Sequence, residues 1–396
     1  MEVRAHGDIE LTDDDGDIRN LAPGAYLTIT DRTGILGAVT FEARSVNGKV
    51  ERKWSGLSGD AERRKWLADH LLELVRTSGF AAESRVARIL KQSGPDGVLQ
   101  EISRITSDYV KRIYFRRLFD TGSLDAAALS RSLAQAGREM RSAYDLASVL
   151  SGVAPRIRDD QPRIAYLQAV KSINSDYERR RALSAIIGTG PLSATVAAAL
   201  LDAATSIRSD YDLASVLTQL LQATDVTEAN RDAFLSALNT IQSDYERRRV
   251  LTALTGRARV APAALTVVYA SASQMRSPYD LATVLTASIR SHPLDASTRA
   301  SFFQAFAKLT SDYERRRVLT TLANETRLDA DTLVALLQSA AQINSSFDRA
   351  SVLLTVARKY PLQGQARDAY LAAARNISSR YEQDRALAAL TRSEIR

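Results

Sequence analysis

Cysteine is absent from the 396-residue sequence, which excludes disulfides, thiolate nucleophiles and cysteine metal sites. Its absence fits an oxidising compartment, although a cytoplasmic protein can also lack cysteine by chance. The sequence holds only three histidines, and none of them is followed by glutamate. The zinc-peptidase pattern His-Glu-x-x-His is therefore missing.

Long apolar runs are missing as well. No stretch approaches the roughly 18 consecutive apolar residues that a membrane-spanning helix needs. The first ten residues, MEVRAHGDIE, lack the basic start and apolar core of a signal peptide. They already read as a strand, which leaves open whether a leader or an anchor precedes Met1 in a longer protein. We slightly favour an extracytoplasmic location over a cytoplasmic one.

Lysine is scarce, with 8 Lys against 45 Arg. The formal net charge is +7, but residues 1–60 carry 7 basic and 11 acidic side chains, so the positive excess lies in the rest of the chain. Spread over that length the excess is modest. We therefore expect a protein or peptide partner and not a nucleic acid.

A repeat occupies most of the chain. SDYERRRVLTAL (243–254) recurs almost unchanged at 175–186 and 311–322, with equal spacing between successive copies. Alignment on its serine finds nine copies: Ser107, Ser142, Ser175, Ser209, Ser243, Ser277, Ser311, Ser345 and Ser379. Their near-constant period of about 34 residues is typical of a solenoid of stacked helix pairs.

Each copy begins with a helix-start signal. Ser-x-x-Glu is a capping box, in which Ser243 accepts from the Glu246 amide and the Glu246 carboxylate reaches back to the serine amide. Pro278 fits the first helical position of its copy. The segment before the motif, such as residues 227–241, has apolar residues at helical spacing and predicts a second helix in each repeat.

The sequence thus predicts a mainly α fold, an αα-repeat solenoid that is HEAT-like with a period close to that of tetratricopeptide repeats, preceded by a small antiparallel β module. Residues 3–12, 24–32, 38–46 and 49–54 read as strands, and Asn47-Gly48 is a strong hairpin signal. We expect three regions: 1–58 as the β module, 59–94 as a helical cap or linker, and 95–396 as the solenoid of about nine helix pairs.

The segments GDIELTDDDGDIRNLAPGAYLTI, RVARIL and EISRITSDYVKRIYF, followed by Ser-Asp-Tyr-Glu repeats, carry a resemblance. They are similar to a bacterial family of membrane-associated proteins, in some of which this region follows an integral-membrane metallopeptidase of the penicillin-sensing receptor type or a short anchored head. Because the peptidase motif is absent, no peptidase activity carries over. The resemblance implies an accessory sensing or scaffold region outside the cytoplasmic membrane.

An aromatic residue stands two positions after every serine, as Tyr in eight copies and as Phe347 in one. An exposed binding ladder is one interpretation of this pattern. Because Phe347 fills the position without a hydroxyl group, we expect instead that each ring packs across the corner between the two helices of its repeat.

Arginine triplets in three odd-numbered copies, together with single arginines before even-numbered serines, are the candidate partner-binding residues. They are Arg179, Arg180, Arg181, Arg208, Arg247, Arg248, Arg249, Arg276, Arg315, Arg316 and Arg317. Equivalent positions of stacked repeats form a line, which could grip phosphates, acidic peptides or anionic lipid headgroups. However, DYERRR nets only +1.

We therefore expect the arginines mainly to pair with carboxylates within and between turns, such as Asp244 with Arg248 and Glu246 with Arg249. Arg249 could also stack on Tyr245, and Arg208 or Arg276 could pair with a carboxylate of a neighbouring turn. The stem of Arg247 is expected to cover apolar surface while its head reaches out.

Other polar clusters predict no chemistry. DDDGD (13–17) departs from the spacing of an EF-hand, so we expect a solvated turn. His70 and Glu73 share a helix face, but two ligands do not make a metal site. With no catalytic constellation, we expect no enzyme activity, cofactor or metal.

We expect a non-catalytic binding or scaffold module that presents its solenoid surface to a partner. The alternatives are a regulatory domain of a membrane peptidase or other enzyme outside this sequence, and an anion- or nucleic-acid-binding solenoid that uses the arginine triplets.

Overall fold

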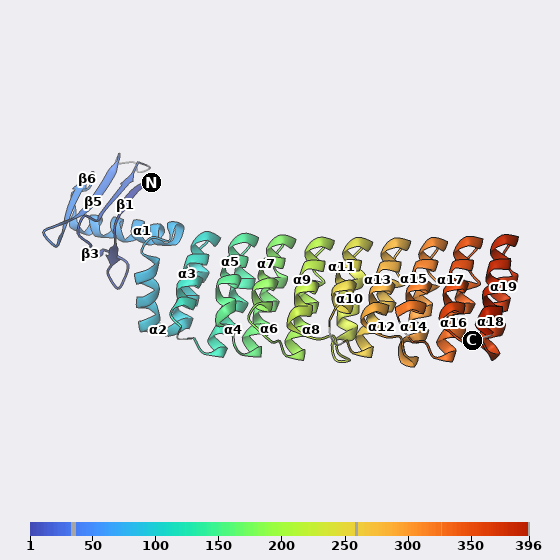
Figure 1. The fold of residues 1–396 in the computed structure, drawn as a ribbon. Helices are drawn as coiled ribbons and strands as arrows, with labels where there is room; N and C mark the ends of the chain where they lie inside the picture. The colour runs from blue at the N-terminus through green and yellow to red at the C-terminus, as the bar shows by residue number, and fades with distance from the viewer. Residues whose placement is uncertain (33–36, 123, 258–259, 326, 395–396) are drawn as a thin grey trace. The chain divides into compact units, whose positions relative to one another are not determined.

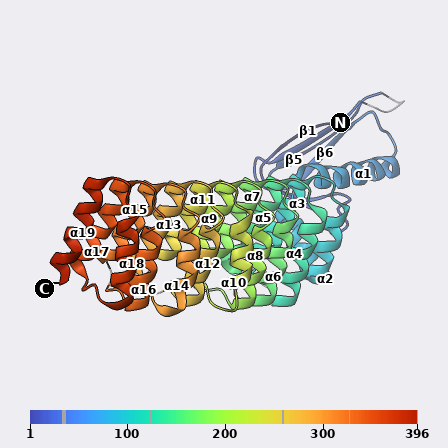
Figure 2. The same cartoon turned by 90° about the vertical axis from the view of Figure 1, so that its right-hand side faces the viewer.

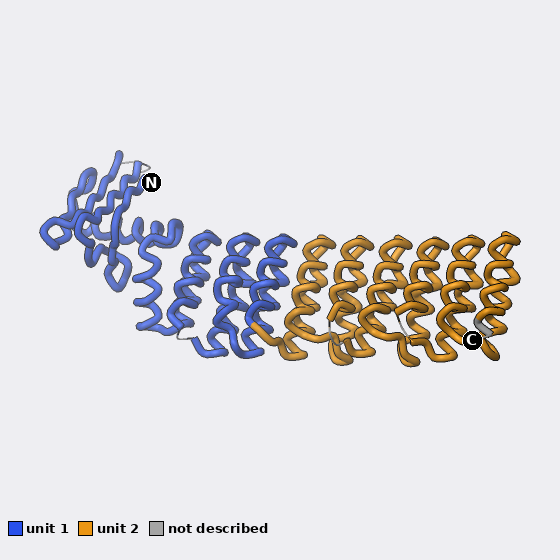
Figure 3. Tube along the Cα trace, in the orientation of Figure 1, with its two compact units in different colours: residues 1–189 blue, residues 190–396 orange. Residues whose placement is uncertain are grey.

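The computed structural model describes residues 1–32, 37–122, 124–257, 260–325 and 327–394. The chain divides into two compact units, residues 1–189 and 190–396, coloured separately in Figure 3. The first unit holds the β-strands and helices α1 to α7, and the second holds α8 to α19 (Figure 1). The predicted fold class, helical repeats with a small N-terminal antiparallel β module, is confirmed.

The strands are β1 (Glu2–His6), β2 (Ile9–Leu11), β3 (Ile18–Leu21), β4 (Tyr26–Asp31), β5 (Val39–Val46) and β6 (Lys49–Ser55). The helices of the first unit are α1 (Asp60–Ser78), α2 (Ala82–Arg104), α3 (Asp108–Asp120), α4 (Ala126–Glu139), α5 (Ala143–Val153), the 3-10 turn η1 (Ala154–Arg156), α6 (Asp160–Lys171) and α7 (Asp176–Ile187). None of the helices in the described part of the chain has the length and apolarity needed to cross a membrane.

The helices of the second unit are α8 (Ala194–Ala204), α9 (Asp210–Ala223), α10 (Arg231–Thr240), α11 (Asp244–Thr255), α12 (Pro262–Ala272), α13 (Pro278–Ser291), α14 (Ala296–Phe306), α15 (Asp312–Glu325), α16 (Ala330–Ala340), α17 (Ser346–Lys359), α18 (Gly364–Arg375) and α19 (Arg380–Glu394).

The β module is a four-stranded antiparallel sheet in the order β1-β4-β5-β6 beside a two-stranded sheet of β2 and β3. Asn47 and Gly48 join β5 to β6 with φ of 49° and 75°, so the predicted hairpin is confirmed. The segment 3–12 is not one strand, because Gly7 takes a φ of 74° and separates β1 from β2.

Helix α1 shares a hydrophobic core with the sheet. The buried face of the sheet includes Leu27, Ile29, Phe41 and Ala43, and the buried side of α1 supplies Leu67, Leu71, Leu74 and Val75. The α1 residues recur at the spacing of one helix face. At Gly94 the backbone of α2 leaves helical geometry, just before Pro95. The predicted boundaries at 58/59 and 94/95 remain predictions, while the division between the two compact units falls at 189/190.

In the second unit the helices form two rows (Figures 1 and 2). The first helices of the repeats, α8, α10, α12, α14, α16 and α18, contact one another in sequence order. The second helices, α9, α11, α13, α15, α17 and α19, do the same. The residue two before each serine is aliphatic and buried in all nine repeats, so it closes the core at the turn between the two helices of its repeat.

The repeat serines begin the second helices, as predicted. Ser243 Oγ accepts from the Glu246 amide at 3.3 Å, and seven further repeat serines make the equivalent bond. Ser107 makes no such side-chain bond to any described residue.

The other half of the predicted capping box is wrong. The Ser243 amide donates to Asp210 Oδ2 of the preceding repeat at 2.7 Å, and the Glu246 carboxylate lies against Arg249. An aspartate directly after a repeat serine therefore caps the next repeat, as Asp244 also does for Ser277.

Candidate functional site: an aromatic and arginine ladder

The aromatic residue of each repeat is exposed, which overturns the expectation that it packs in the core. The exposed fraction runs from 52% at Tyr109 to 70% at Tyr381. The series is Tyr109, Tyr144, Tyr177, Tyr211, Tyr245, Tyr279, Tyr313, Phe347 and Tyr381. The rings stand at the first turn of the second helix, two residues after the repeat serine.

The second arginine of a triplet lies between two of these rings. The guanidinium carbon of Arg248 is 5.0 Å from the ring centre of Tyr245 and 5.5 Å from that of Tyr279 in the next repeat. Its Nε lies 2.9 Å from Asp280, also in the next repeat, and not against Asp244 as predicted. Two repeats later Arg316 has the same geometry, against Tyr313, Phe347 and Asp348.

The third arginine of a triplet reaches back to the preceding repeat. Arg249 lies 5.0 Å from the ring centre of Tyr211, not Tyr245 as predicted, and donates to the Tyr211 carbonyl at 3.2 Å. It also donates to Ser215 Oγ at 2.9 Å. Its Nε lies 3.1 Å from Glu246, which confirms that predicted ion pair. Arg181 and Arg317 make equivalent contacts, Arg181 to Tyr144 and Ser148 and Arg317 to Tyr279 and Thr283.

The first arginine of a triplet points inward. Arg247 is only 6% exposed and donates to the Ile241 carbonyl at the end of the first helix of its own repeat, so its head does not reach out as predicted. Burial lowers the pKa of the Arg247 guanidinium. Arg179 makes the same bond to Ile173, whereas Arg315 donates to Gln342 in the next repeat.

The remaining candidates lie at the surface. Arg208 and Arg276 are exposed, and Asp244 accepts from the backbone amide of Arg276 at 2.8 Å. Arg180 lies over the Tyr177 ring at 5.1 Å. We call the exposed rings together with the second and third arginines the ladder, with one segment in each compact unit.

The alternation of the repeats follows from these contacts. Odd repeats supply the arginines, whereas even repeats supply an aspartate for the second arginine and a hydroxyl group for the third. Sequence reasoning missed Arg112, which lies between Tyr109 and Tyr144 and pairs with Asp145. Its alignment with Arg248 relative to the repeat serine was the available signal.

The ladder is polar but locally neutral. Arg248, Arg249 and Arg316 each have a carboxylate within 3.1 Å. These side chains are 21–32% exposed, whereas the rings Tyr245, Tyr279 and Tyr313 are 55–57% exposed. The rings are therefore more exposed than the arginines, and they offer an incoming molecule the larger accessible fraction.

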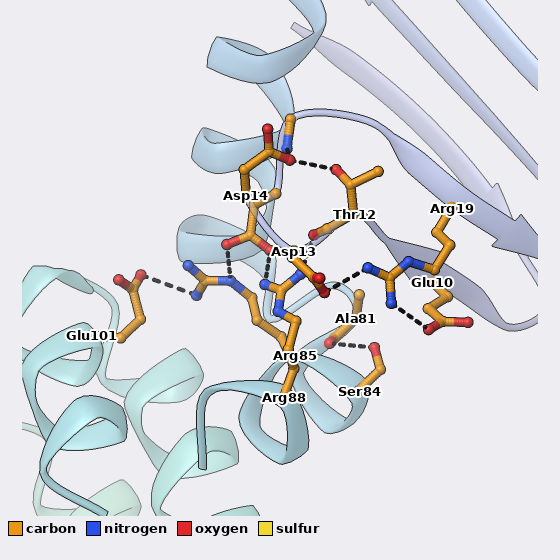
Figure 4. A network of polar contacts seen from close by, with 12 residues as sticks. Glu10, Thr12, Asp13, Asp14, Arg19, Ala81, Ser84, Arg85, Arg88 and Glu101 are labelled. Carbon is orange, nitrogen blue, oxygen red and sulfur yellow. Dashed lines mark hydrogen bonds and ion pairs between the residues drawn. The ribbon is translucent and has the colours of Figure 1, made fainter. Parts of the chain in front are cut away.

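A second polar cluster lies in the first unit, where the DDDGD turn meets α2. Asp15 is only 8% exposed and lies 2.7 Å from Arg85, so the expectation of a solvated turn is wrong for this residue. Arg88 also contacts Asp15. Figure 4 shows both arginines pointing from α2 toward the turn, and Arg85 reaching Glu101 as well.

Hydrogen bonds and opposite charges favour the ionised forms of Arg85 and Glu101 in this cluster. Burial alone would lower the pKa of Arg85, but the Tyr114 hydroxyl and the carboxylates of Asp15 and Glu101 raise it overall. Burial opposes ionisation of Glu101 too, yet hydrogen bonds from Arg76 and Arg85 lower its pKa. The cluster thus fastens the turn to α2 through ion pairs between largely buried side chains.

His70 takes part in packing. Its ring stacks on Trp66 with centres 3.8 Å apart, Nδ1 lies 2.8 Å from the Trp66 carbonyl, and Nε2 lies 3.3 Å from Asp31. Across the described ranges, no group of three His, Asp or Glu side chains is arranged to hold a metal ion.

Neither protein-family models nor curated proteins gave a match to this sequence.

Proposed function

We propose that this protein is a non-catalytic binding module that presents the ladder to a protein or peptide partner. The observation that carries the proposal is the exposure of an aromatic ring at the same position of all nine repeats. Tyr and Arg, like Trp, are enriched at binding hot spots, because they offer a large contact area and directional donors.

The fixed geometry of the ladder supports this role. Arg248 lies between Tyr245 and Tyr279 and contacts both rings, which restricts the rotamers that the two side chains can adopt before a partner arrives. Ordering a mobile side chain on binding costs about 0.5–1.5 kcal/mol, and preorganised rings avoid part of that cost.

Charge favours a peptide over a nucleic acid or another polyanion. A phosphate-binding surface needs uncompensated cations. The ladder arginines Arg248, Arg249 and Arg316 already have carboxylate partners. By its family resemblance, the module would act as an accessory or sensor region of a bacterial membrane-associated protein.

Selection from a phage-displayed peptide library on the whole chain tests the proposal. Selected peptides, measured by fluorescence anisotropy, should bind a Tyr245→Ser/Tyr313→Ser variant about tenfold or more weakly than the wild type. Tyr26→Ser, which removes an exposed ring from β4, is the matched control and should bind normally. Selection of no peptide, or equal binding to the ladder variant, would refute the proposal.

A further inference from the structure

The spacing of the rings restricts what kind of peptide can follow the ladder. The Arg248 guanidinium carbon lies 5.0 and 5.5 Å from the centres of Tyr245 and Tyr279, so those two centres can be no further apart than the sum of these distances. The corresponding distances of 4.9 and 5.7 Å from Arg316 set nearly the same limit for Tyr313 and Phe347. Packed helices lie about 8–10 Å apart, which is within this limit, so we take that range as the period of the rings.

A polyproline II helix matches this period. It has three residues per turn and rises about 3.1 Å per residue, so equivalent residues recur on one edge about every 9.3 Å. A β-strand covers a similar distance in three residues, but its side chains alternate between faces, so every second ring would meet a side chain pointing away. Of these two extended conformations, only the threefold one presents the same edge to each successive ring.

The hydrogen-bonding groups of the ladder also fit. A polyproline II segment leaves its carbonyl groups without internal partners, and proline contributes no amide donor. The ladder offers donors: exposed tyrosine hydroxyls on the rings, and guanidinium groups such as Arg248, whose five N–H donors exceed what the single Asp280 carboxylate can accept. Apolar proline rings and tyrosine rings complete the match, as in other aromatic surfaces that bind proline-rich segments.

We propose that the ladder of the second unit binds an extended, proline-rich peptide in the polyproline II conformation, with every third residue seated against a successive aromatic ring. This inference rests on the proposed function and names the class of its partner. An amphipathic α-helix can also present a residue of one face to each ring, since two of its turns rise about 10.8 Å. Its backbone carbonyls are already hydrogen-bonded internally, however, so they cannot accept from the ladder donors as those of a polyproline II segment can.

The test uses a series of labelled oligoprolines, from two to five polyproline turns long. The whole protein is titrated into each peptide, and binding is measured by fluorescence anisotropy. Affinity should rise several-fold with each added turn, until the peptide spans the rings. A Gly-Ser peptide and an alanine-rich helical peptide, both matched in length to the longest oligoproline, should bind at least tenfold more weakly. Equal binding of either control peptide, or no dependence on oligoproline length, would overturn the proposal.

Two substitutions at one ring sharpen the test. Tyr279→Ser should lower the affinity for the four-turn oligoproline about tenfold, whereas Tyr279→Phe, which keeps the ring, should lose only a few-fold. Tyr26→Ser should have no effect, and circular dichroism verifies that each variant is folded. Unchanged binding to folded Tyr279→Ser contradicts the assignment of the site.

The outcomes separate this inference from the proposed function. If library selection yields peptides that depend on the ladder but oligoprolines do not bind, the polyproline assignment fails and the binding function stands. If neither library peptides nor oligoprolines depend on Tyr245, Tyr279 and Tyr313, both fail. Helical peptides that bind through the ladder would replace the polyproline partner with a helical one.

Discussion

Replacement of Arg248 by glutamine should loosen the contact between α11 and α13. The change removes an ion pair with Asp280, whose two side chains are only 21% and 14% exposed, and two guanidinium–ring contacts, to Tyr245 and Tyr279. An ion pair of this kind contributes about 0.2–1 kcal/mol and each ring contact about 0.5–1 kcal/mol. The free energy of local unfolding should therefore fall by roughly 1–3 kcal/mol.

Hydrogen exchange read by mass spectrometry is the appropriate assay, because repeat arrays open locally before they unfold as a whole. Amides of α11 and α13 should exchange faster in Arg248→Gln. The exposed Arg276 supplies the matched control, since Arg276→Gln changes the same charge in the same unit outside the ladder. A double-mutant cycle with Asp280→Asn should give a coupling of about 0.2–1 kcal/mol. Zero coupling together with unchanged exchange would refute the stabilising role of the Arg248 contacts with Asp280, Tyr245 and Tyr279.

Two further substitutions test the contacts that sequence reasoning did not find. Asp244→Ala should strand the amide of Ser277 and cost about 0.5–2 kcal/mol, seen as faster exchange at the start of α13. Arg85→Met should remove one cation from Asp15, which keeps Arg88, and one from Glu101, which keeps Arg76. The cost in urea unfolding should therefore be smaller than the roughly 3–5 kcal/mol of a buried charge left with no partner. Because folding lowers the pKa of Glu101, its stabilising contribution is complete above the unfolded value of about 4.3 and is lost on acidification through the folded pKa. The stability difference between wild type and Glu101→Gln should accordingly shrink as the solution is acidified below that range.

Much of the fold was predictable because it depends on local patterns. The serine caps, the apolar spacing and the Asn47-Gly48 hairpin each act within a few residues, and the constant period extended the helix pair found in one repeat to the others. The break of residues 3–12 into two strands was not predicted, since it depends on Gly7 lying against Ala25 of a later segment. Sequence pattern does not show such a long-range close approach.

The ladder was only partly predictable, because its contacts cross between repeats. The pairing of arginines with carboxylates of neighbouring turns was expected, but the partner of Arg248 was sought at Asp244 in its own helix and lies at Asp280 in the next repeat. The exposure of Tyr245 was missed for a related reason. An aromatic residue at the same position of every repeat suggests burial in the core. Its exposure could be predicted only by knowing that guanidinium groups cover part of each ring.

Because odd repeats supply the ladder arginines and even repeats their partners, deletions of one repeat and of two repeats should differ in the contacts made by α9. Joining Gln242 directly to Ser277 removes a single repeat and places α9 beside α13. Both belong to even repeats, so neither supplies an arginine to the other. Joining Gln242 to Ser311 removes a pair of repeats, one odd and one even, and places α15 beside α9. Arg317 then stands where Arg249 stood.

In the shorter protein Arg317 can donate to the Tyr211 carbonyl and to Ser215, as Arg249 does in the intact chain. The variant that lacks only one repeat has no such arginine at the contact between α9 and α13. Amides of α9 should therefore exchange faster in the longer deletion variant than in the shorter one, although a nearest-neighbour array otherwise gains stability with every added repeat. Hydrogen exchange of α9 compares the two directly. Equal or better protection of α9 in the longer variant would show that the repeats pack without regard to odd and even, and that the arginines of the ladder serve the partner alone.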